Sequence, residues 1–275
     1  MSSTIPVKPA AEIKSYRDSH LGEGRSYHDK FRVGPHRSVI WEIEQGIILE
    51  LFRRWRPVGP IRHLDFACGT GRILQLLGTC VDRSVGVDVS ESMLAVAREE
   101  NPGADLRLVD LTREQPFSNG SFDLITAFRF FPNAEEPLRD EAMHALTRLL
   151  APEGLLIVNN HLRAEGTKMR LRAGLARLGF GGSARDRHCM RDEEIESLAG
   201  KYGLIVLEAR ELGFVPVLNE KHPGFPRTWL RWIESAANDR TPFRGFGNLK
   251  VYALRRGRSG ADARELEAEI RCSSS

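Results

Sequence analysis

The stretch I-R-H-L-D-F-A-C-G-T-G, from Ile61 to Gly71, decides how the rest of the chain is interpreted. A short apolar run ends in an acid, and small residues and two glycines follow it. This pattern predicts a buried strand that leads into a tight turn. Glycine suits such a turn because it adopts positive φ angles without strain and lets a ligand approach the backbone closely. A turn that binds nothing is the alternative, so the neighbouring segments have to decide.

Downstream of this turn, predicted strands alternate with predicted helices. Four more buried strands are predicted over residues 84–89, 104–109, 122–128 and 155–159, and helices over residues 36–56, 73–77, 90–100 and 134–150. This alternation predicts an α/β fold with a doubly wound, mostly parallel sheet, in which ligands bind beyond the carboxyl ends of the strands. The glycine turn, Asp88 and Asp110 all lie at such ends, so we expect them to line one crevice.

The second half of the chain is less regular. Its apolar runs predict strands over residues 204–209 and 248–255 and helices over residues 192–202 and 226–237. The alternating pattern of the last strand is compatible with an antiparallel strand at the edge of a seven-stranded sheet. We expect an N-terminal arm or cap over residues 1–35, a domain over residues 36–256 with a basic segment at 161–191 and a helical insertion at 214–247, and a flexible tail over residues 257–275.

The composition bears on several function classes. Lys and Arg number 40 against 37 Asp and Glu, so the net charge of +3 does not favour nucleic acid or a membrane surface. No run approaches the roughly eighteen apolar residues of a spanning helix, and the first fifteen residues lack the apolar core of a signal peptide. The cysteines lie far apart without a C-x-x-C pair, which disfavours a zinc cage or a disulfide scaffold. We therefore expect a soluble, cytoplasmic protein without a metal site.

Two kinds of ligand suit a glycine turn that is followed by acids at the next strand ends. Dinucleotide folds place a third small residue where this chain has Leu74, which disfavours NAD and FAD. A nucleoside without phosphates fits better, because the carboxylate of Asp88 can accept hydrogen bonds from both ribose hydroxyls. Asp110 can accept a hydrogen bond from an adenine amino group, and Asp65 lies near the turn for an amino-acid tail. These requirements describe S-adenosylmethionine.

Five segments, in this order, resemble the successive motifs of class I S-adenosylmethionine-dependent methyltransferases, which share a Rossmann-like fold. They are His63 to Leu74, V-D-V-S-E-S-M-L (87–94), Asp110-Leu111, P-F-S-N-G-S-F-D-L-I (116–125) and L-T-R-L-L-A-P-E-G-L-L-I-V (146–158). The resemblance therefore covers residues 61–160. Two positions depart from the family pattern, because Ala67 stands in place of the first glycine of the turn and Glu153 in place of a glycine before the fifth strand.

The resemblance implies cofactor contacts at these strand ends. Gly69 and Gly71 would form the cofactor loop, Asp65 would bind the methionine amino group, and Asp88 would bind the ribose. The other positions that the resemblance implies are Ala67, Val89, Met93, Asp110, Leu111, Ala127 and Phe128. Turn formation alone is the alternative for the strand-end acids, and core packing is the alternative for Met93.

Transfer of a methyl group from a sulfonium mainly requires alignment of the acceptor and exclusion of water, with a general base where the acceptor is a hydroxyl. The segment A-F-R-F-F-P-N (127–133) lacks the N/D-P-P-Y/F tetrapeptide of resembling enzymes that methylate planar amines or amides, which favours oxygen as the acceptor. His161, directly after the fifth strand, is the candidate base, and Asn133 is a candidate for orienting the acceptor. In the arm, Tyr27 and His28 are candidates for closing over a ligand.

The segment from Arg163 to Arg191 bears on the charge of the acceptor. It has eight basic residues against two acidic ones, which is either a solvated helix face or an electropositive lip for an acidic acceptor. We therefore predict methylation of a small-molecule or glycan acceptor, most favourably at a hydroxyl. RNA methylation is the alternative within enzymes, although no stripe of aromatic and basic residues supports single-strand stacking. A cofactor-binding subunit without catalytic activity is the alternative from another class.

Overall fold

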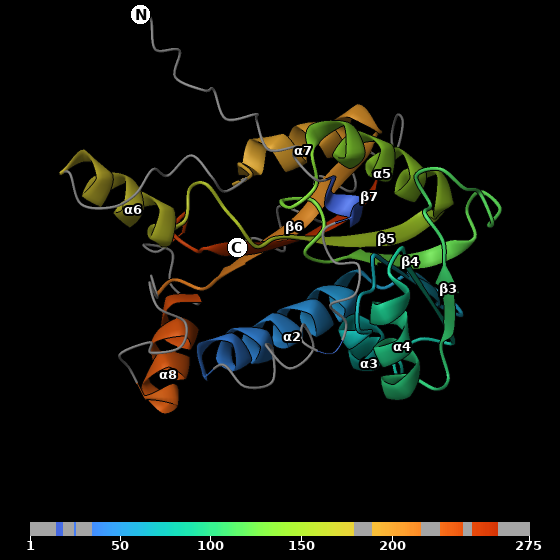
Figure 1. Cartoon of the computed structure of the whole chain (residues 1–275), viewed down its shortest axis with the longest axis horizontal. Coiled ribbons are helices and arrows are strands. Elements are labelled where there is room, and N and C mark those ends of the chain that lie inside the picture. Colours follow the sequence, from blue (N-terminus) through green and yellow to red (C-terminus); the bar gives the residue numbers. More distant parts are fainter. Residues whose placement is uncertain are drawn as a thin grey trace, which may run out of the picture.

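The computed structural model of the chain describes residues 15–18, 25, 35–178, 189–215, 226–238 and 244–257. A seven-stranded sheet runs through the middle of the described molecule, with helices on both of its faces (Figure 1). The strands are β1 (Arg62–Phe66), β2 (Arg83–Asp88), β3 (Asp105–Leu108), β4 (Phe122–Ala127), β5 (Leu150–Asn160), β6 (Leu204–Leu212) and β7 (Leu249–Arg256). The helices are η1 (Tyr16–Asp18), α2 (Pro35–Trp55), α3 (Arg72–Leu77), α4 (Glu91–Glu100), α5 (Glu136–Leu149), α6 (Thr167–Arg177), α7 (Asp192–Lys201) and α8 (Arg227–Asn238).

The order of the strands is β3-β2-β1-β4-β5-β7-β6. Strands β1 to β5 are parallel, and β7 runs antiparallel to both of its neighbours, β5 and β6. This confirms the predicted doubly wound, mostly parallel sheet, and it adds that the antiparallel strand lies one position in from the edge. From β1 the chain adds β2 and β3 on one side, and it then crosses to add β4 and β5 on the other side. Doubly wound sheets bind ligands at this point, where the strand order reverses.

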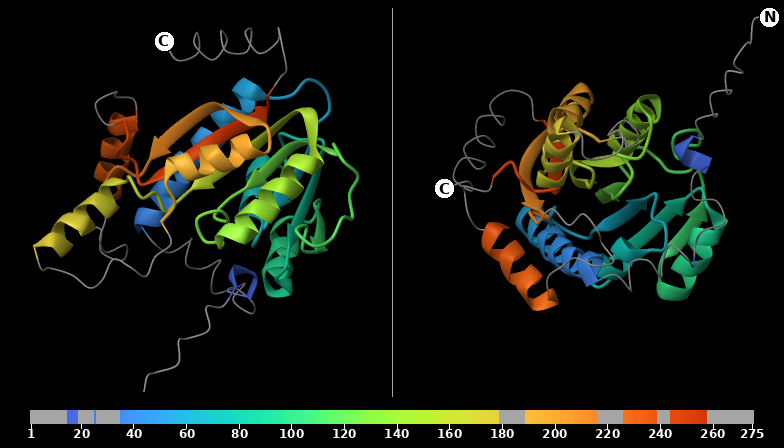
Figure 2. Two further views of the ribbon diagram at one scale, coloured as in Figure 1. Left: turned by 90° about the horizontal axis from the view of Figure 1, so that it is seen from above. Right: turned by 60° about the vertical axis from the view of Figure 1, so that its left-hand side comes forward.

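Each face of the sheet has its own apolar core, because successive side chains of a strand point to opposite faces. Ile125 of β4 and Leu156 of β5 belong to the core beneath α5 and α7. Their sequence neighbours Leu124 and Leu155 belong to the core beneath α2 and α3. The view from above shows α5 and α7 on the near side of the sheet and α2 beyond it (Figure 2). These two layers hold the carboxyl ends of the central strands in fixed positions.

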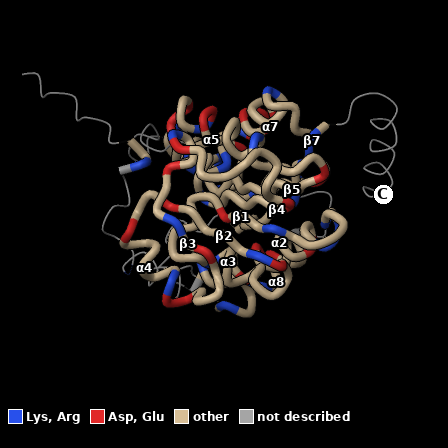
Figure 3. The backbone as a smooth tube through the Cα atoms, turned by 90° about the vertical axis from the view of Figure 1, so that its right-hand side faces the viewer, with Lys and Arg blue, Asp and Glu red and all other residues tan. Residues whose placement is uncertain are grey.

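The peripheral helices differ in how firmly they are packed. Helix α8 lies beside α2 and β6 (Figure 2). Helix α6 follows β5 and extends away from the sheet, and none of its residues is buried (Figure 1). Acidic and basic residues are interspersed along the described backbone (Figure 3). Among the described helices, none has both the length and the apolar character needed to cross a bilayer.

The turn after β1 gives the first testable prediction. Gly71 has a φ of 79°, and a Cβ atom there would collide with the side chain of Asn101 and lie 3.3 Å from the Cβ of Ala97. We expect Gly71→Ala to lower the free energy of unfolding by about 1–3 kcal/mol, because left-handed strain and the collision add together. Urea denaturation measures this change.

Gly46 provides the matched control for this substitution. It is exposed within α2, and a Cβ atom there would meet nothing within 4 Å. Gly46→Ala should therefore raise the free energy of unfolding by about 0.5–1 kcal/mol, because alanine loses less backbone entropy in a helix. Equal stability changes in the two variants would contradict the described turn.

Candidate active site

The turn that follows β1 has left-handed backbone at three alternate positions. The φ angles are 51° at Ala67, 55° at Gly69 and 79° at Gly71. Glycine adopts such angles freely, whereas alanine does so at a cost, so Ala67 is a strained substitute for the glycine of the family pattern. A Cβ atom at Gly69 would meet nothing within 4 Å, which means that this side of the turn is open to a ligand.

Asp88, at the end of β2, joins this turn to the start of the next helix. One carboxylate oxygen, Oδ2, accepts the backbone N–H of Gly69 at 2.8 Å, and the other, Oδ1, accepts the N–H of Ser90 at 2.9 Å. A carboxylate has about four acceptor positions, so further hydrogen bonds from two ribose hydroxyls are compatible with this arrangement. The role of Asp88 in ribose binding stays a prediction.

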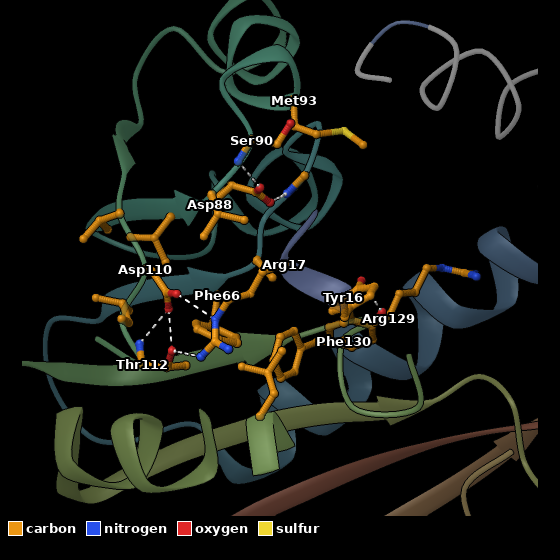
Figure 4. A pocket seen from close by; sticks show the side chains of 18 residues that line it. Tyr16, Arg17, Phe66, Asp88, Ser90, Met93, Asp110, Thr112, Arg129 and Phe130 are labelled. Atoms are coloured by element: carbon orange, nitrogen blue, oxygen red, sulfur yellow. Dashed lines mark hydrogen bonds and ion pairs between the residues drawn. The ribbon is translucent and has the colours of Figure 1, made fainter. Parts of the chain in front are cut away.

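Asp110 follows β3 and forms an ion pair with Arg17 of η1. Its Oδ1 atom accepts hydrogen bonds from the backbone N–H and the hydroxyl of Thr112, and its Oδ2 atom lies 2.9 Å from Nε of Arg17. Burial raises the pKa of Asp110, but the Thr112 hydrogen bonds and the Arg17 charge outweigh it and hold the pKa below its ordinary value. Figure 4 shows Asp88, Asp110 and Arg17 directed toward the same pocket.

Asp65 lies beneath the turn in an almost fully buried position, with an exposed fraction of 2%. Its Oδ1 atom accepts the Thr126 hydroxyl at 2.7 Å, whereas its Oδ2 atom has no hydrogen-bond partner among the described residues. Burial, reinforced by the charge of Asp88, raises the pKa of Asp65 to about 7, although Thr126 and Arg72 oppose the shift. The site therefore contains a buried acceptor atom that lacks a donor.

His63 extends this buried polar line across the sheet. Its Nε2 atom lies 2.8 Å from the Thr126 hydroxyl, which itself donates to Asp65. Burial lowers the pKa of His63 to about 3, so the ring is neutral and donates from Nε2 to Thr126. Sequence reasoning did not identify His63 or Thr126, although a histidine and a threonine within apolar strands were the available signal.

The residues at these strand ends line one pocket of about 100 Å³. Of the predicted cofactor residues, those that line it are Ala67, Gly69, Asp88, Val89, Met93, Asp110, Leu111 and Phe128. The other three do not line it: Asp65 and Gly71 are buried in and below the turn, and Ala127 is fully buried in β4. Cys68, in the same turn, is buried, and burial raises its thiol pKa well above the ordinary value, which disfavours a nucleophilic role.

The part of the N-terminal arm that is described, Ser15 to Asp18, closes one side of this pocket. The Tyr16 hydroxyl donates to the backbone carbonyl of Arg129 at 3.1 Å, and its ring packs edge-to-face on Phe130. The hydroxyl of Ser15 donates to Glu135 at 2.6 Å. Sequence reasoning did not identify Arg17, Arg129 or Phe130 as pocket residues. Tyr27 and His28 lie outside the described residues.

The two residues predicted to act on the acceptor lie near the ends of β4 and β5. The side-chain N–H of Asn133 donates to the Arg129 carbonyl at 2.6 Å, so this amide supports the turn after β4. His161 follows β5, and its Nδ1 atom is buried without a hydrogen-bond partner among the described residues. Burial and the charges of Arg129 and Arg72 lower the pKa of His161 well below the ordinary value, so its ring is unprotonated at neutral pH.

The basic segment divides into buried and exposed parts. Arg163 is only 3% exposed and forms a bidentate ion pair with Asp192, with Nε–Oδ1 and NH2–Oδ2 distances of 2.8 and 2.7 Å. It is therefore a structural residue and not part of a surface lip. In the described part of the segment, Arg170, Arg177 and Arg191 are exposed, and Lys168 and Arg172 are half-buried. All of these except Arg191 lie on α6.

Comparison with known proteins agrees with this geometry. A family model described as a methyltransferase domain matches residues 64–158. The magnesium protoporphyrin IX methyltransferase of Synechocystis PCC 6803, solved with bound S-adenosylhomocysteine, superimposes with a TM-score of 0.58 at 14% identity and covers 87% of this chain and 97% of its own. Residues 64–158 are therefore a methyltransferase domain.

Two curated relatives of this methyltransferase have named acceptors. The dTDP-3-amino-3,6-dideoxy-alpha-D-glucopyranose N,N-dimethyltransferase of Streptomyces fradiae is 28% identical over 187 residues, 66% of each chain. The 18S rRNA (guanine-N(7))-methyltransferase bud23 of Schizosaccharomyces pombe is 38% identical over 82 residues, 28% of this chain and 31% of its own. The methyltransferase thus spans just under two thirds of the first relative and about a third of the second.

The pocket of this methyltransferase fits S-adenosylmethionine. The unsatisfied Oδ2 atom of Asp65 requires a donor, and the methionine ammonium group is a charged one. The open backbone of Gly69 allows close approach, and Val89, Met93 and Leu111 supply apolar walls for a nucleoside. The contacts assigned to individual residues stay predictions.

The raised pKa of Asp65 leads to a prediction about stability. The folded-state pKa of about 7 exceeds the ordinary value of 3.8, so the folded protein binds more protons than the unfolded chain between these values. The contribution of Asp65 to the free energy of unfolding therefore decreases as pH rises from about 4 to about 7. Asp65→Asn should stabilise the cofactor-free protein more at pH 8 than at pH 5, by about 1–4 kcal/mol.

The same residue should behave in the opposite way toward the cofactor product. A charged carboxylate pairs with an ammonium group, so S-adenosylhomocysteine should bind the wild type more tightly at pH 8 than at pH 6. Asp65→Asn should bind it weakly and without this pH dependence. Calorimetric titration at the two pH values measures both effects, and parallel pH profiles for wild type and variant would contradict the assignment.

Proposed function

We propose that this protein transfers a methyl group from S-adenosylmethionine to a hydroxyl of a small-molecule or glycan acceptor in the cytosol. The observation that carries the proposal is the buried Oδ2 atom of Asp65, which has no hydrogen-bond partner among the described residues and lies beneath the turn that borders the pocket lined by Asp88 and Asp110. An amino-acid tail attached to a nucleoside meets both requirements at once. The cytosolic location is inferred from the wide spacing of the cysteines.

S-adenosylmethionine supplies, when bound, a methyl group that its positively charged sulfur has already activated. The protein residues therefore have to bind, orient and exclude water. Asp65 and Asp88 hold the amino and ribose groups, and Tyr16 and Arg17 cover the adenosine end of the pocket. The unprotonated ring of His161 accepts the proton of the acceptor hydroxyl.

The nature of the acceptor is supported by the relative from Streptomyces fradiae, whose name specifies an amino sugar linked to dTDP. A sugar acceptor suits a domain whose pocket lies at the strand ends. That relative methylates nitrogen, so an amine is the direct rival to a hydroxyl. The segment from Ala127 to Asn133 lacks the tetrapeptide that holds planar amines or amides, which disfavours those acceptors, whereas the amine of an amino sugar is not planar.

RNA is the second candidate acceptor. Helix α6 has four basic residues, no acidic residue and no buried side chain, and it is the next helix after β5, the strand that His161 follows. Such a helix could neutralise phosphates, and the fission-yeast relative bud23 is named for methylation of 18S rRNA. A cofactor-binding subunit without activity is the remaining alternative.

Transfer of a labelled methyl group tests the proposed function. The protein is incubated with methyl-labelled S-adenosylmethionine and either a small-molecule extract or total RNA, and the label is followed by mass spectrometry. We expect label in an O-methylated small molecule and none with Asp88→Ala, which should lose at least tenfold in cofactor affinity. Label in RNA, with binding that falls steeply with salt, would favour the second candidate. Cofactor binding without transfer would favour the subunit without activity.

The candidate base gives a separate prediction. His161→Gln should lower kcat by about 10²–10⁴-fold, the range typical of general-base removal, while the affinity for S-adenosylhomocysteine stays unchanged. His144→Gln is the matched control, because His144 is exposed on α5. Steady-state kinetics with the identified acceptor measure the effect, and equal kcat values in the two variants would exclude His161 as the base.

A further inference from the structure

Arg129, directly beyond the end of β4, has a left-handed backbone with a φ of 59°. An arginine is strained in this region, and such strain persists only where the surroundings hold it. Here the Arg129 N–H donates to Oδ1 of Asn159 at 2.7 Å, and its carbonyl accepts hydrogen bonds from the Tyr16 hydroxyl and the Asn133 amide. Every backbone polar group of Arg129 is thus held by a side chain from another part of the chain.

The network continues from Asn159 to Glu44 of α2. Both side chains are buried, with exposed fractions of 0% and 1%, and the Asn159 N–H donates to Oε1 of Glu44 at 2.7 Å. The second oxygen of Glu44, Oε2, lies 3.8 Å from the guanidinium of Arg129. A buried carboxylate is costly unless it is paired, so its presence here needs a reason. Glu44 fixes the amide that holds the Arg129 backbone and also attracts the Arg129 side chain.

The Arg129 side chain is directed toward the acceptor side of the site. In Figure 4 it extends away from Asp110 and the adenosine end of the pocket, toward α2. The Arg129 side chain is 22% exposed, so a ligand can reach it. The charges of Arg129 and Arg72 both lower the pKa of His161, and Glu44 is the acidic partner of Arg129.

We propose that Arg129 binds an anionic group, a carboxylate or a phosphate, on the methyl acceptor, and that Glu44 and Asn159 are positioning residues for it. This inference rests on the proposed function, since it requires an acceptor at the ends of β4 and β5. The planar guanidinium can donate two parallel hydrogen bonds to either kind of group. An anion at Arg129 also offsets the positive charge near His161, which raises the pKa of the imidazole and makes it a stronger base.

Anion binding to the complex with S-adenosylhomocysteine tests this proposal without a known acceptor. Malonate and inorganic pyrophosphate serve as the carboxylate and phosphate probes in calorimetric titrations at low salt. We expect saturable binding of at least one probe, and the probe that binds identifies the anionic group. Arg129→Gly should weaken this binding at least tenfold, because glycine adopts the left-handed backbone but lacks the guanidinium. If neither probe binds the wild type, the proposal is overturned.

Arg98→Met is the matched control, because Arg98 lies on α4 with 45% of its side chain exposed and pairs with Glu91 away from the pocket. It should bind the probes as the wild type does. Arg129→Lys, a second variant that keeps the charge, should recover only part of the affinity. Arg98→Met should also bind S-adenosylhomocysteine as the wild type does, and the probes are titrated into the Arg129 variants at saturating S-adenosylhomocysteine, because Arg129 lines the cofactor pocket. Equal probe binding by Arg129→Gly and wild type overturns the anion site alone, whereas failure of the wild type to bind S-adenosylhomocysteine overturns the proposed function.

A spectroscopic measurement separates positioning from a general structural role. The pKa of His161, followed by NMR of its ring resonances, should rise when the bound probe is added to the wild type and should stay constant in Arg129→Gly. Asn159→Ala should weaken probe binding without changing the affinity for S-adenosylhomocysteine, because it releases the Arg129 backbone. An unchanged probe affinity in Asn159→Ala would overturn the positioning role.

Discussion

The carboxylate of Asp88 is the interaction on which the site depends. Parallel pairing of β1 with β2 brings Phe66 opposite Val87, so the two strands end at about the same level. Asp88 then accepts N–H groups from Gly69, in the turn after β1, and from Ser90, next to the start of α4. Two turns are thereby fixed by one side chain, which also lines the pocket.

A second constraint crosses the middle of the sheet. His63, Thr126 and Asp65 form a buried polar line inside two apolar layers, and burial shifts the pKa values of its two titratable members in the directions that favour their neutral forms. A structural polar network would satisfy all of its acceptors, because a partly satisfied network destabilises a core. Among the described residues, this one leaves both Oδ2 of Asp65 and Nδ1 of His63 without a hydrogen-bond partner. The buried carboxyl of Asp65 therefore lowers the local stability of the cofactor-free protein. An ammonium group bound at Oδ2 would recover this stability.

The sequence was sufficient for features that short segments determine. Asp88 and Asp110 were predicted at strand ends because an apolar run followed by an acid is a local pattern, and the alternation of Ile125 with Leu124 follows from strand geometry. Contacts between distant segments have no such local signal. Tyr16 reaches Arg129 across 113 residues and Asn159 reaches Glu44 across 115. The left-handed backbone of Arg129 and the exposed helix α6 were missed because neither glycine nor an apolar stripe marks them.

The ion pair between Arg17 and Asp110 shows how such long-range contacts change the hydrogen-bonding capacity of a motif residue. Asp110 looked like a free acceptor for an adenine amino group, yet Thr112 donates twice to its Oδ1 atom and Arg17 donates once to Oδ2. Of about four acceptor positions on a carboxylate, one therefore remains, on Oδ2. An adenine amino group needs only one, so it can bind while Arg17 stays in place. Arg17 thus lines the pocket beside Asp110, and the predicted adenine contact would share this carboxylate with the arm.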